Sequence, residues 1–281
     1  YKLKIITSVE DQKKLSKELI NDNRNISLIP TMGNLHLGHE SLLKSSTEDD
    51  YRVSSLFINP LQFDDINDYN NYPKTIEKDI EILKSYKIDC LFLPYKEGII
   101  SNVSNNERLS LPKFTDTLCG KYRKNHFQGV FIIVKKLFEI VQPSKAYFGK
   151  KDYQQILLIK HLVNEYFGGN IEIIQCETIR ENNGLAMSSR NSHLTQDQRD
   201  LAAIVYKKIC FLKEAFLDNK DLFDQNKKIV LKNLLDLGIK IEYLEILSRN
   251  TLTKPRQNDK EVNIFVAFYV GNTRLIDNIE I

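Results

Sequence analysis

The sequence predicts an α/β protein, with a doubly wound parallel sheet in an N-terminal domain and a smaller α+β domain after it. Over the first two-thirds of the chain, apolar runs alternate with helical patterns, which is typical of parallel βαβ units. The last third instead has two helical segments and then three strand-like runs. We place the boundary near Thr178, which gives domains at 1–178 and 179–281.

Six apolar runs of the N-terminal domain are expected to be strands, separated by helices. The first helix opens at Ser8, where Ser8-Val9-Glu10-Asp11 resembles a capping box. The next strand leads into a helix that carries two histidines and includes residues 40–44. The expected strands are residues 3–6, 26–29, 51–58, 89–93, 145–148 and 171–174. The other expected helices are residues 8–20, 74–86, 131–140 and 152–166.

The C-terminal domain is expected to be two helices followed by a small sheet. The helices are predicted at 197–217 and 221–237. Three strands follow, and Gly271-Asn272 between the last two is a good hairpin turn signal. These strands are predicted at 239–247, 261–270 and 273–279.

Composition narrows the class of protein. The formal net charge is +3 and there is no long block of lysine and arginine, which argues against a nucleic-acid partner. The cysteines are scattered, with no Cys-x-x-Cys pair, so we expect buried thiols rather than a zinc or redox site. The chain begins without a signal-like apolar core, and no segment approaches the length of a membrane span. We therefore expect no membrane association and a cytoplasmic location.

The most informative segment is Pro-Thr-Met-Gly-Asn-Leu-His-Leu-Gly-His, residues 30–39, between an expected strand and a helix. The first N–H groups of a helix have no intrahelical partner and lie at the positive end of its dipole, so an anion binds there readily. Gly33 and Gly38 allow the backbone to approach a ligand closely. His36 and His39, spaced i and i+3, share one face and can donate hydrogen bonds to phosphate oxygens. The alternatives are a metal-binding pair or two surface histidines.

Two further segments are rich in groups that bind phosphate. Met187-Ser188-Ser189-Arg190 offers hydroxyls and a guanidinium suited to a triphosphate, although a polar interdomain loop is the alternative. At Gly149-Lys150-Lys151-Asp152 a strand turns into a helix, so Lys151 can meet a phosphate and Asp152 a ribose hydroxyl. The alternative for that junction is a solvated helix cap. Together these segments indicate an enzyme that opens ATP at its α-phosphate and transfers the adenylyl group.

Polar residues near the other strand ends are candidates for binding the acceptor. Asn59 and Gln62 follow a strand, Gln155 lies one helical turn beyond the Lys151 junction, and Arg123 and His126 precede another helix. Carboxamides suit hydroxyl and carboxylate groups, and arginine can hold a carboxylate with two hydrogen bonds. A polar turn and an ordinary basic loop are the alternatives. Because ligands of doubly wound sheets bind at the carboxyl ends of the strands, these loops should converge on one crevice.

The sequence resembles the pantothenate synthetase family (pantoate–β-alanine ligases) of the HxGH nucleotidyltransferase-like superfamily. The resemblance covers nearly the whole chain and is densest from Pro30 to Asn191. It rests on six motifs in the family order: Pro-Thr-Met-Gly-x-Leu-His-x-Gly-His, Asn-Pro-x-Gln-Phe, Tyr-Pro-Lys-Thr, His-Phe-x-Gly-Val, Phe-Gly-x-Lys-Asp-x-Gln-Gln and Gly-Leu-Ala-Met-Ser-Ser-Arg-Asn.

The resemblance implies a Rossmann-like N-terminal domain, a C-terminal lid and a two-step reaction. ATP and pantoate would form pantoyl adenylate and pyrophosphate, and β-alanine would then give pantothenate and AMP. It implies that Mg²⁺ arrives with ATP, that the protein is a homodimer through its N-terminal domain, and that no residue is a dedicated metal ligand.

The resemblance also assigns roles to residues. Catalysis would involve His39, His36 and Lys151, with His39 in the position usually labelled proton donor. Gln62 and Gln155 would hold pantoate, Gln62 would also lie near β-alanine, and Asn59, Arg123 and His126 complete our substrate candidates. The implied ATP-binding residues are Met32, Gly33, Asn34, Leu35, His36, Leu37, Gly38, His39, Gly149, Lys150, Lys151, Asp152, Ile179, Met187, Ser188, Ser189 and Arg190.

Three positions depart from the family pattern. Asn34 stands where alanine is usual, Lys150 replaces a common glutamate, and Lys124-Asn125 replaces a frequent Pro-Gly. We expect Lys150 to add positive charge beside the phosphates and the 124–125 loop to be looser.

Two other classes of function remain as alternatives. An adenylyltransferase that acts on a phosphorylated acceptor would need basic residues where Gln62 and Gln155 stand. A nucleotide-binding regulatory module would bind ATP without turnover. Pantoate-dependent exchange of pyrophosphate into ATP separates the first from a pantoate–β-alanine ligase, and an assay for product with β-alanine excludes the second.

Overall fold

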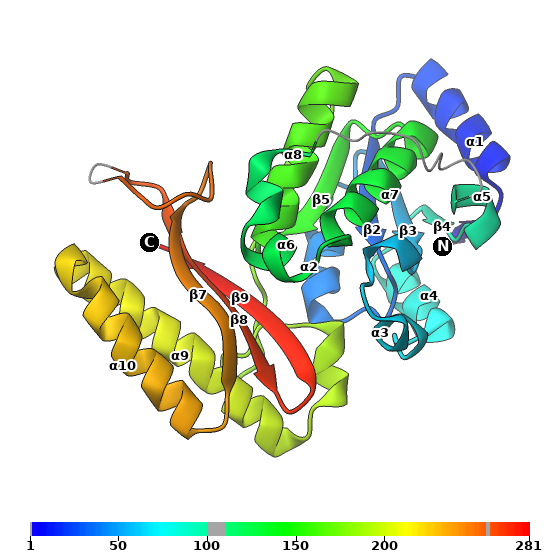
Figure 1. Cartoon of the computed structure of the whole chain (residues 1–281). Helices are drawn as coiled ribbons and strands as arrows, with labels where there is room; N and C mark the ends of the chain where they lie inside the picture. The colour runs from blue at the N-terminus through cyan, green and yellow to red at the C-terminus, as the bar shows by residue number, and fades with distance from the viewer. Residues whose placement is uncertain (1, 101–110, 257–258) are drawn as a thin grey trace.

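The computed structural model describes residues 2–100, 111–256 and 259–281. Its N-terminal part is built on a six-stranded parallel sheet, and its C-terminal part on a three-stranded antiparallel sheet. Figure 1 shows the second sheet lying between the N-terminal part and a pair of long helices. The fold class predicted from the sequence is confirmed.

The parallel sheet reverses its strand order between β2 and β5, which are neighbours in the sheet. The order is β1-β4-β3-β2-β5-β6, so β3 and β4 follow β2 on one side, and β5 and β6 are added on the other side of β2. A ligand crevice is expected at such a reversal, outside the carboxyl ends of the strands. The strands are β1 (Lys4–Ile6), β2 (Ile26–Thr31), β3 (Tyr51–Leu56), β4 (Cys90–Phe92), β5 (Lys145–Gly149) and β6 (Glu172–Cys176).

Helices cover both faces of this sheet, and each face has its own apolar core. One core contains side chains of α1 (Val9–Asn21), α7 (His126–Val141) and α8 (Tyr153–Phe167). The other contains side chains of α2 (Leu37–Ser45) and α4 (Ile76–Ser85). Because both faces are covered, the central strands are apolar along most of their length, which explains why simple apolar runs identified them.

The predicted capping box at the start of α1 forms only in part. Ser8 accepts a hydrogen bond from the backbone N–H of Asp11 at 3.2 Å, but its hydroxyl donates to the Glu10 carboxylate. Asp11 is one methylene shorter than the glutamate that usually returns the bond. A complete capping box occurs instead at Thr195, with Gln198 as the partner, where the sequence analysis placed only a helix start.

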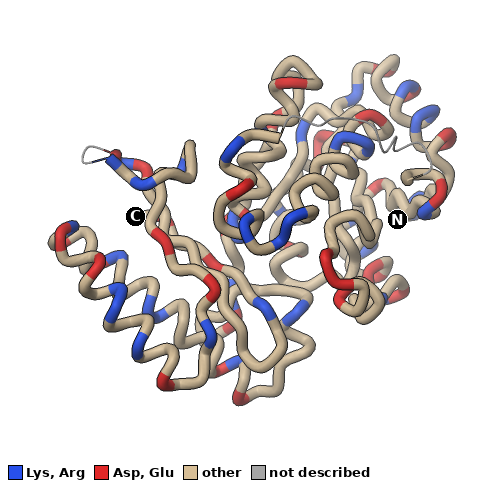
Figure 2. Tube along the Cα trace, in the orientation of Figure 1, with Lys and Arg blue, Asp and Glu red and all other residues tan. Residues whose placement is uncertain are grey.

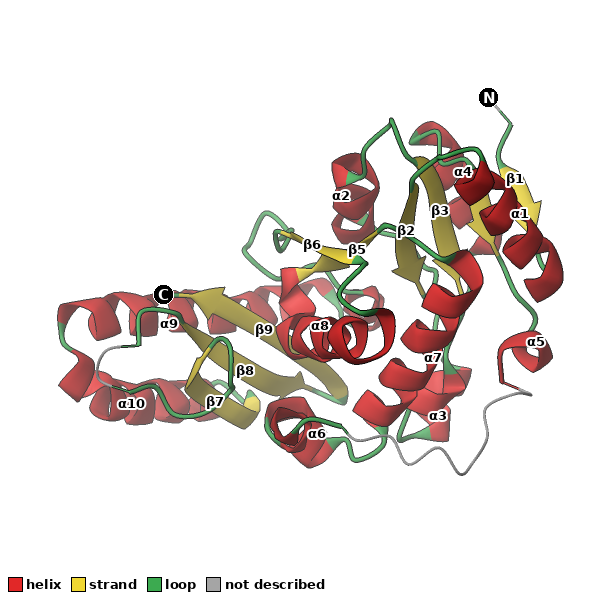
Figure 3. Ribbon diagram, turned by 90° about the horizontal axis from the view of Figure 1, so that it is seen from above, coloured by secondary structure: helices red, strands yellow, loops and turns green. Residues whose placement is uncertain are grey.

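The C-terminal sheet has the order β7-β8-β9 and is covered on both faces. Leu244 and Val266 pack against the helices, while Tyr243 and Phe265 belong to the core shared with the N-terminal part. In Figure 3, seen from above, the three strands overlie α9 and α10. Its elements are α9 (Gln196–Asp218), α10 (Phe223–Asp236), β7 (Lys240–Ser248), β8 (Val262–Val270) and β9 (Thr273–Glu280).

Short helices and single turns were not predicted from the sequence. They are too short to show a helical period, and several lie between β3 and α7, close to the strand ends. They are η1 (Pro60–Gln62), α3 (Ile66–Asn70), α5 (Lys96–Ile100), η2 (Lys113–Asp116), α6 (Leu118–Tyr122), η3 (Lys150–Asp152), η4 (Ser189–His193) and η5 (Lys220–Leu222).

The surface carries charges of both signs on each part. Figure 2 shows basic and acidic residues interspersed along the N-terminal and C-terminal parts. Of the four cysteines, Cys90, Cys119 and Cys176 are buried and Cys210 is partly exposed, and all are free thiols. None of the described helices combines the length and apolarity needed to cross a bilayer.

Candidate active site

The loops after β2, β3 and β5 open on one cavity between the two parts of the molecule. The cavity has a volume of about 270 Å³ and is lined by Pro30, Asn59 and Gly149, which each follow or end one of these strands. Residues 187–190 line the same cavity. The convergence predicted from the strand ends is therefore present in the structure.

A buried carboxylate fixes the loop between β2 and α2. Gly33 and Asn34 both have positive φ, at 85° and 52°, and the Asp79 side chain is 0% exposed. Asp79 accepts hydrogen bonds from the backbone N–H groups of Asn34 (2.9 Å) and Leu35 (2.8 Å) and from the Thr75 hydroxyl (3.1 Å). Because Asp79 lies in the first turn of α4, the helix dipole also favours its charge.

We expect Asp79→Asn to lower the free energy of unfolding by about 2–4 kcal/mol, because an amide cannot accept all three bonds and leaves a buried N–H unpaired. Guanidinium denaturation followed by circular dichroism measures this change. Glu77→Gln is the matched control, since it removes one negative charge from the same helical turn at an exposed position. Equal stabilities for the two variants would contradict the assignment of Asp79 as the anchor of this loop.

The two histidines lie in contact at the start of α2. His36 is the N-cap residue, and its Nδ1 accepts a hydrogen bond from the backbone N–H of Gly38 at 3.1 Å. A neutral His36 therefore carries its proton on Nε2, free to donate elsewhere. The His39 ring centroid lies 4.1 Å from that of His36. A Cβ at Gly38 would lie 2.9 Å from His36 Cε1, so a larger residue there would displace the His36 ring.

Burial keeps both histidines neutral in the ligand-free protein. It lowers the pKa of His36 to about 4, and the positive charge of Lys151 contributes. Burial also lowers the pKa of His39 well below its ordinary value, with His36 and Lys151 adding to the effect. Protonation of either ring near neutral pH would therefore require a bound anion to raise these pKa values.

These lowered pKa values predict that the free energy of unfolding falls as the pH drops from about 7 to about 5. His126 contributes as well, because burial and the charge of Arg123 lower its pKa to about 3. Between a pKa of about 6.5 in the unfolded chain and about 4 in the folded one, only the unfolded chain takes up protons, so stability is lost in that window. For each of these rings that stays neutral in the folded protein we expect a loss of about 2 kcal/mol, measured by denaturant titration at the two pH values.

The His126→Asn variant should show a smaller loss over the same pH interval, because it removes one of the titrating groups. A free energy of unfolding that is equal at both pH values for the parent protein would contradict the neutral, buried state of these rings.

The residue 30–39 loop and the residue 187–190 segment meet directly. The Ser189 hydroxyl lies 3.5 Å from the Asn34 carbonyl oxygen, and the position of a Cβ at Gly38 is 3.3 Å from Met187 Cβ. Met187 is held by its N–H, which donates to the Ile179 carbonyl at 2.9 Å. The two segments in which the sequence analysis expected phosphate donors are thus adjacent in space.

Strand β9 of the C-terminal part anchors the loop after β5. Asn278 Nδ2 donates to the carbonyl oxygens of Lys150 and Lys151, both at 2.9 Å. The ammonium of Lys150 pairs with Glu177 and Glu280, and Lys150 does not line the cavity. The expectation that Lys150 adds positive charge beside the phosphates is therefore wrong for this structure, since two carboxylates neutralise it. Lys151 does line the cavity.

Gln62 and Gln155 line the cavity, and Asn59 supports Gln62. Asn59 is 2% exposed, and its Nδ2 donates to Gln62 Oε1 (2.9 Å) and to the Gly129 carbonyl (3.0 Å). Its Oδ1 accepts from the Leu61 N–H at 3.0 Å. With its amide used in this way, Asn59 positions Gln62 in the ligand-free protein and has few groups left for a substrate.

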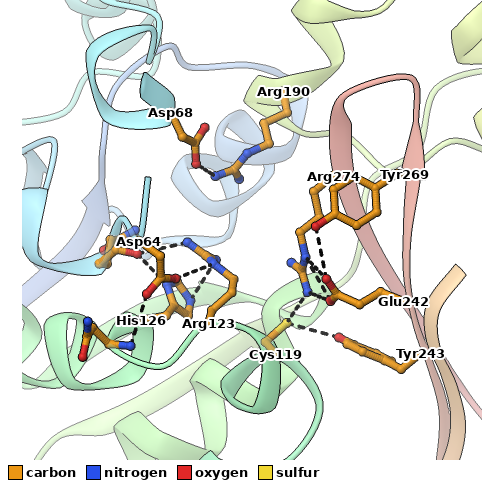
Figure 4. Close-up of polar contacts among 12 residues, drawn as sticks. Asp64, Asp68, Cys119, Arg123, His126, Arg190, Glu242, Tyr243, Tyr269 and Arg274 are labelled. Atoms are coloured by element: carbon orange, nitrogen blue, oxygen red, sulfur yellow. Dashed lines mark hydrogen bonds and ion pairs between the residues drawn. The ribbon is translucent and has the colours of Figure 1, made fainter. Parts of the chain in front are cut away.

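Arg123 and His126 border the same side of the cavity. Arg123 Nη2 donates to the Gln62 carbonyl at 3.0 Å, and His126 Nδ1 lies 3.0 Å from the same oxygen. The guanidinium also pairs with Asp64, at 3.4 Å from Nε (Figure 4). Lys124 and Asn125, which depart from the family pattern, are exposed and lie outside the cavity lining.

Most of the residues singled out from the sequence line this cavity. Those that do are Met32, His36, Gly38, His39, Asn59, Gln62, Arg123, His126, Gly149, Lys151, Asp152, Gln155, Ile179, Met187, Ser188, Ser189 and Arg190. Five expected ATP-binding residues do not, namely Gly33, Asn34, Leu35, Leu37 and Lys150. Leu35 is buried in a core, and Leu37 is 58% exposed.

Three residues at the site were missed by the sequence analysis. Asp79 anchors a loop 44 and 45 residues away, Tyr72 lines the cavity, and Arg274 reaches it from β9. Tyr72 had only appeared within the Tyr-Pro-Lys-Thr motif. An acidic residue in a helix's first turn and a cation beside a hairpin turn are common features, so neither was a signal by itself.

Several known proteins are similar to this chain in sequence and fold over nearly their full lengths. The family model described as pantoate-beta-alanine ligase matches residues 4–280. Pantothenate synthetase of Thermosipho africanus is 38% identical over 98% of this chain and 99% of its own. That of Buchnera aphidicola is 40% identical, covering 98% and 97%.

Two solved structures are similar over nearly all residues. Pantothenate synthetase of Thermus thermophilus superposes with a TM-score of 0.89 at 30% identity and covers 99% of each chain. Pantoate-beta-alanine ligase of Francisella tularensis, complexed with beta-gamma ATP and beta-alanine, gives 0.83 at 35% identity, covering 99% of this chain and 98% of its own.

Proposed function

This chain belongs to the pantoate–β-alanine ligase family, and we propose that the cavity described above is where it condenses pantoate with β-alanine. In this reaction the pantoate carboxylate attacks the α-phosphorus of ATP, which forms pantoyl adenylate and releases pyrophosphate. The β-alanine amine then attacks the acyl carbon, the amide bond forms, and AMP leaves. The observation that carries the proposal is that the 30–39 loop and the 187–190 segment touch each other and line the same cavity.

The nucleotide is placed at the reversal point of the sheet. The N-terminus of α2 supplies backbone N–H groups, and His36 has Nε2–H available as a donor. Lys151, Ser188 and Arg190 approach the same space from β5 and from the C-terminal side. We assign these groups to the triphosphate and Asp152 to the ribose. Loop residues Gly33 to Leu35 act through their backbone, which Asp79 holds in place.

Pantoate is placed between Gln62 and Gln155. Its hydroxyl and carboxylate groups suit two carboxamides, and its two methyl groups suit the apolar wall formed by Phe57, Val130 and Val134. The neighbouring Gln154 is used differently. It is buried and binds the carbonyls of Phe114 and Thr117, so it holds the segment before α6 rather than a ligand.

Catalysis needs orientation and charge stabilisation rather than a covalent nucleophile. Adenylation gives the pantoate carboxylate a good leaving group, and the enzyme must hold two anions in line while negative charge builds on pyrophosphate. His39, His36 and Lys151 lie where that charge would develop. The histidines are neutral before binding, so they act first as hydrogen-bond donors, and the arriving phosphates favour their protonation.

Mg²⁺ belongs to the proposal as part of the ATP substrate. The described residues contain no group of three histidine, cysteine, aspartate or glutamate side chains that could hold a metal ion. We therefore assign its coordination chiefly to the triphosphate oxygens, which bind Mg²⁺ in many ATP-dependent enzymes.

Membership of this family also supports three further properties of the protein. We propose a homodimer formed through the N-terminal domain, a cytoplasmic location, and a C-terminal domain from residue 179 onward that acts as a lid. Sedimentation equilibrium tests the first. Small-angle scattering with and without a nonhydrolysable ATP analogue tests the lid, because closure should reduce the radius of gyration.

The test of the function is AMP formation from ATP, with pantoate and β-alanine each omitted in turn. We expect sustained AMP release only when both are present. Pantoate alone should support exchange of labelled pyrophosphate into ATP. Turnover with neither substrate, or exchange that does not depend on pantoate, would contradict the proposal.

A further inference from the structure

A second cavity, of about 800 Å³, lies beside the first. Three residues line both cavities, and all three are arginines: Arg123, Arg190 and Arg274. They come from separate elements, the end of α6, the η4 turn and the start of β9. Figure 4 shows their guanidinium groups approaching a common space from different sides. The boundary between the two cavities is therefore a place where an anionic group can be held.

Arg274 is held rigidly and has an unused donor. Its Nε donates to both carboxylate oxygens of Glu242, at 3.3 and 3.1 Å, and its Nη2 contacts the same carboxylate and Cys119 Sγ (Figure 4). Among the contacts of the described residues, none uses Arg274 Nη1. Burial opposes the charge, but the hydrogen bonds with Glu242 outweigh it and keep the pKa of Arg274 above its ordinary value. Arg274 thus offers a fixed positive donor to a ligand.

The other two arginines add to the positive field at this boundary. Burial lowers the pKa of Arg123, and the charges of Arg190 and Arg274 lower it further, which means that the three cations are close enough to repel one another. Arg190 pairs with Asp68 at 2.8 Å. A carboxylate from a ligand would relieve this repulsion.

The second cavity also carries negative charge, which restricts the ligands that can pass through it. Asp64, Asp65, Asp68 and Glu242 line it together with the three arginines. Asp64, Asp68 and Glu242 each pair with one of these arginines, so the lining has little net positive charge to attract a polyanion such as ATP. A small zwitterion has no net charge and can place its ammonium group near these carboxylates and its carboxylate near the guanidinium groups.

We propose that Arg274, together with Arg123, binds the carboxylate of β-alanine, a proposal that rests on the proposed function. The second cavity is then the path by which β-alanine reaches the adenylate. This assigns the three arginines different tasks. Arg190 stays with the triphosphate, while Arg274 and Arg123 select an amine that carries a carboxylate. The amine end then points into the first cavity, toward the space beside Gln62.

The decisive variant is Arg274→Gln, studied in both half-reactions. Pantoate-dependent exchange of pyrophosphate into ATP should stay within about twofold of the parent, because adenylate formation does not involve β-alanine. The KM for β-alanine in the complete reaction should rise at least about tenfold, the scale of one lost charge-assisted hydrogen bond. Arg274→Lys keeps the charge and should recover part of the loss.

Ethylamine, which is β-alanine without its carboxylate, tests whether Arg274 recognises that carboxylate. If Arg274 had only a structural role, the preference for β-alanine over ethylamine would not change. The parent should use β-alanine far better than ethylamine. In Arg274→Gln this preference should shrink at least about tenfold, with the kcat/KM for ethylamine unchanged. Equal preference in the two proteins, or an unchanged KM for β-alanine, would overturn the inference.

Two controls guard against misfolding and against a general effect of lost charge. The double variant Glu242→Gln, Arg274→Gln removes both charges of the buried pair together and should show the same loss of preference if Arg274→Gln alone folds poorly. Lys227→Met removes a cation from another ion pair of the C-terminal part, with Glu245 at 3.0 Å, and should leave both half-reactions unchanged. If the proposed function itself is wrong, the parent protein will show no pantoate-dependent exchange of pyrophosphate into ATP.

Discussion

The His39→Ala variant is expected to fold as the parent does and to form pantoyl adenylate about 10²-fold more slowly, or worse. A single preorganised donor aimed at developing charge is worth about this much in other enzymes. The His39 ring lines the cavity and packs on His36, so its removal takes away a donor and also frees the partner ring to move. Pantoate-dependent exchange of labelled pyrophosphate into ATP measures the effect directly.

His161→Ala is the matched control for this variant. His161 lies on α8, outside the cavity lining, and its loss should leave the exchange rate near that of the parent. Circular dichroism and the unfolding midpoint show whether each variant has the parent's fold. A well-folded His39→Ala protein with near-normal exchange would remove His39 from the chemistry.

The Lys151→Ala variant is expected to lose a similar factor in adenylate formation, with a second signature in the ligand-free protein. The charge of Lys151 contributes to the lowered pKa values of both His36 and His39. Without that charge the two pKa values should rise, which titration by NMR can follow. The same substitution thus links a kinetic loss to an electrostatic change at neighbouring residues.

Two comparisons make the Lys151 prediction specific. Lys160→Ala, on α8 and outside the cavity lining, should change neither the exchange rate nor the titration of His36. Lys150→Ala is the more demanding comparison, because it removes the ammonium group of the adjacent residue. That ammonium pairs with Glu177 and Glu280, and Lys150 lies outside the cavity lining. A greater loss of adenylate formation in Lys150→Ala than in Lys151→Ala would contradict the orientation of these adjacent side chains.

The sequence was sufficient to predict the main elements because their signals are local. Several strands of the parallel sheet contain a short apolar run, since both faces of the sheet are covered by helices. The Gly271-Asn272 turn also lies where it was predicted, with Val270 paired to Thr273 across it. α3 and α6 have five residues each, too few for a period to be recognised.

The candidate site was predictable where one segment contains both a turn and the groups that can donate hydrogen bonds to phosphate. The 30–39 loop is such a segment. The loop's support was not predictable, because Asp79 is distant in sequence and acts only after α4 packs beside β2. The sequence singled out Lys151 for a phosphate, but it could not show that the charge of Lys150 is directed elsewhere. Which of these neighbours faces the cavity depends on how β9 anchors their backbone through Asn278.

Arg274 could not be recognised from the sequence either, because its role depends on contacts between distant segments. Its importance comes from its position at the boundary of two cavities and from its pairing with Glu242, and both arise only when β7, β8 and β9 form a sheet against the N-terminal part. No local pattern around residue 274 distinguishes it from the other arginines of the chain. A contact between distant segments is the only signal, and it exists only in the folded protein.

The most direct test is a crystal structure of the protein with a nonhydrolysable ATP analogue. We expect one bound triphosphate to accept hydrogen bonds both from the His39 side of the cavity and from Ser188. A nucleotide bound elsewhere, or one that contacts the α2 side while Ser188 stays out of reach, would contradict it.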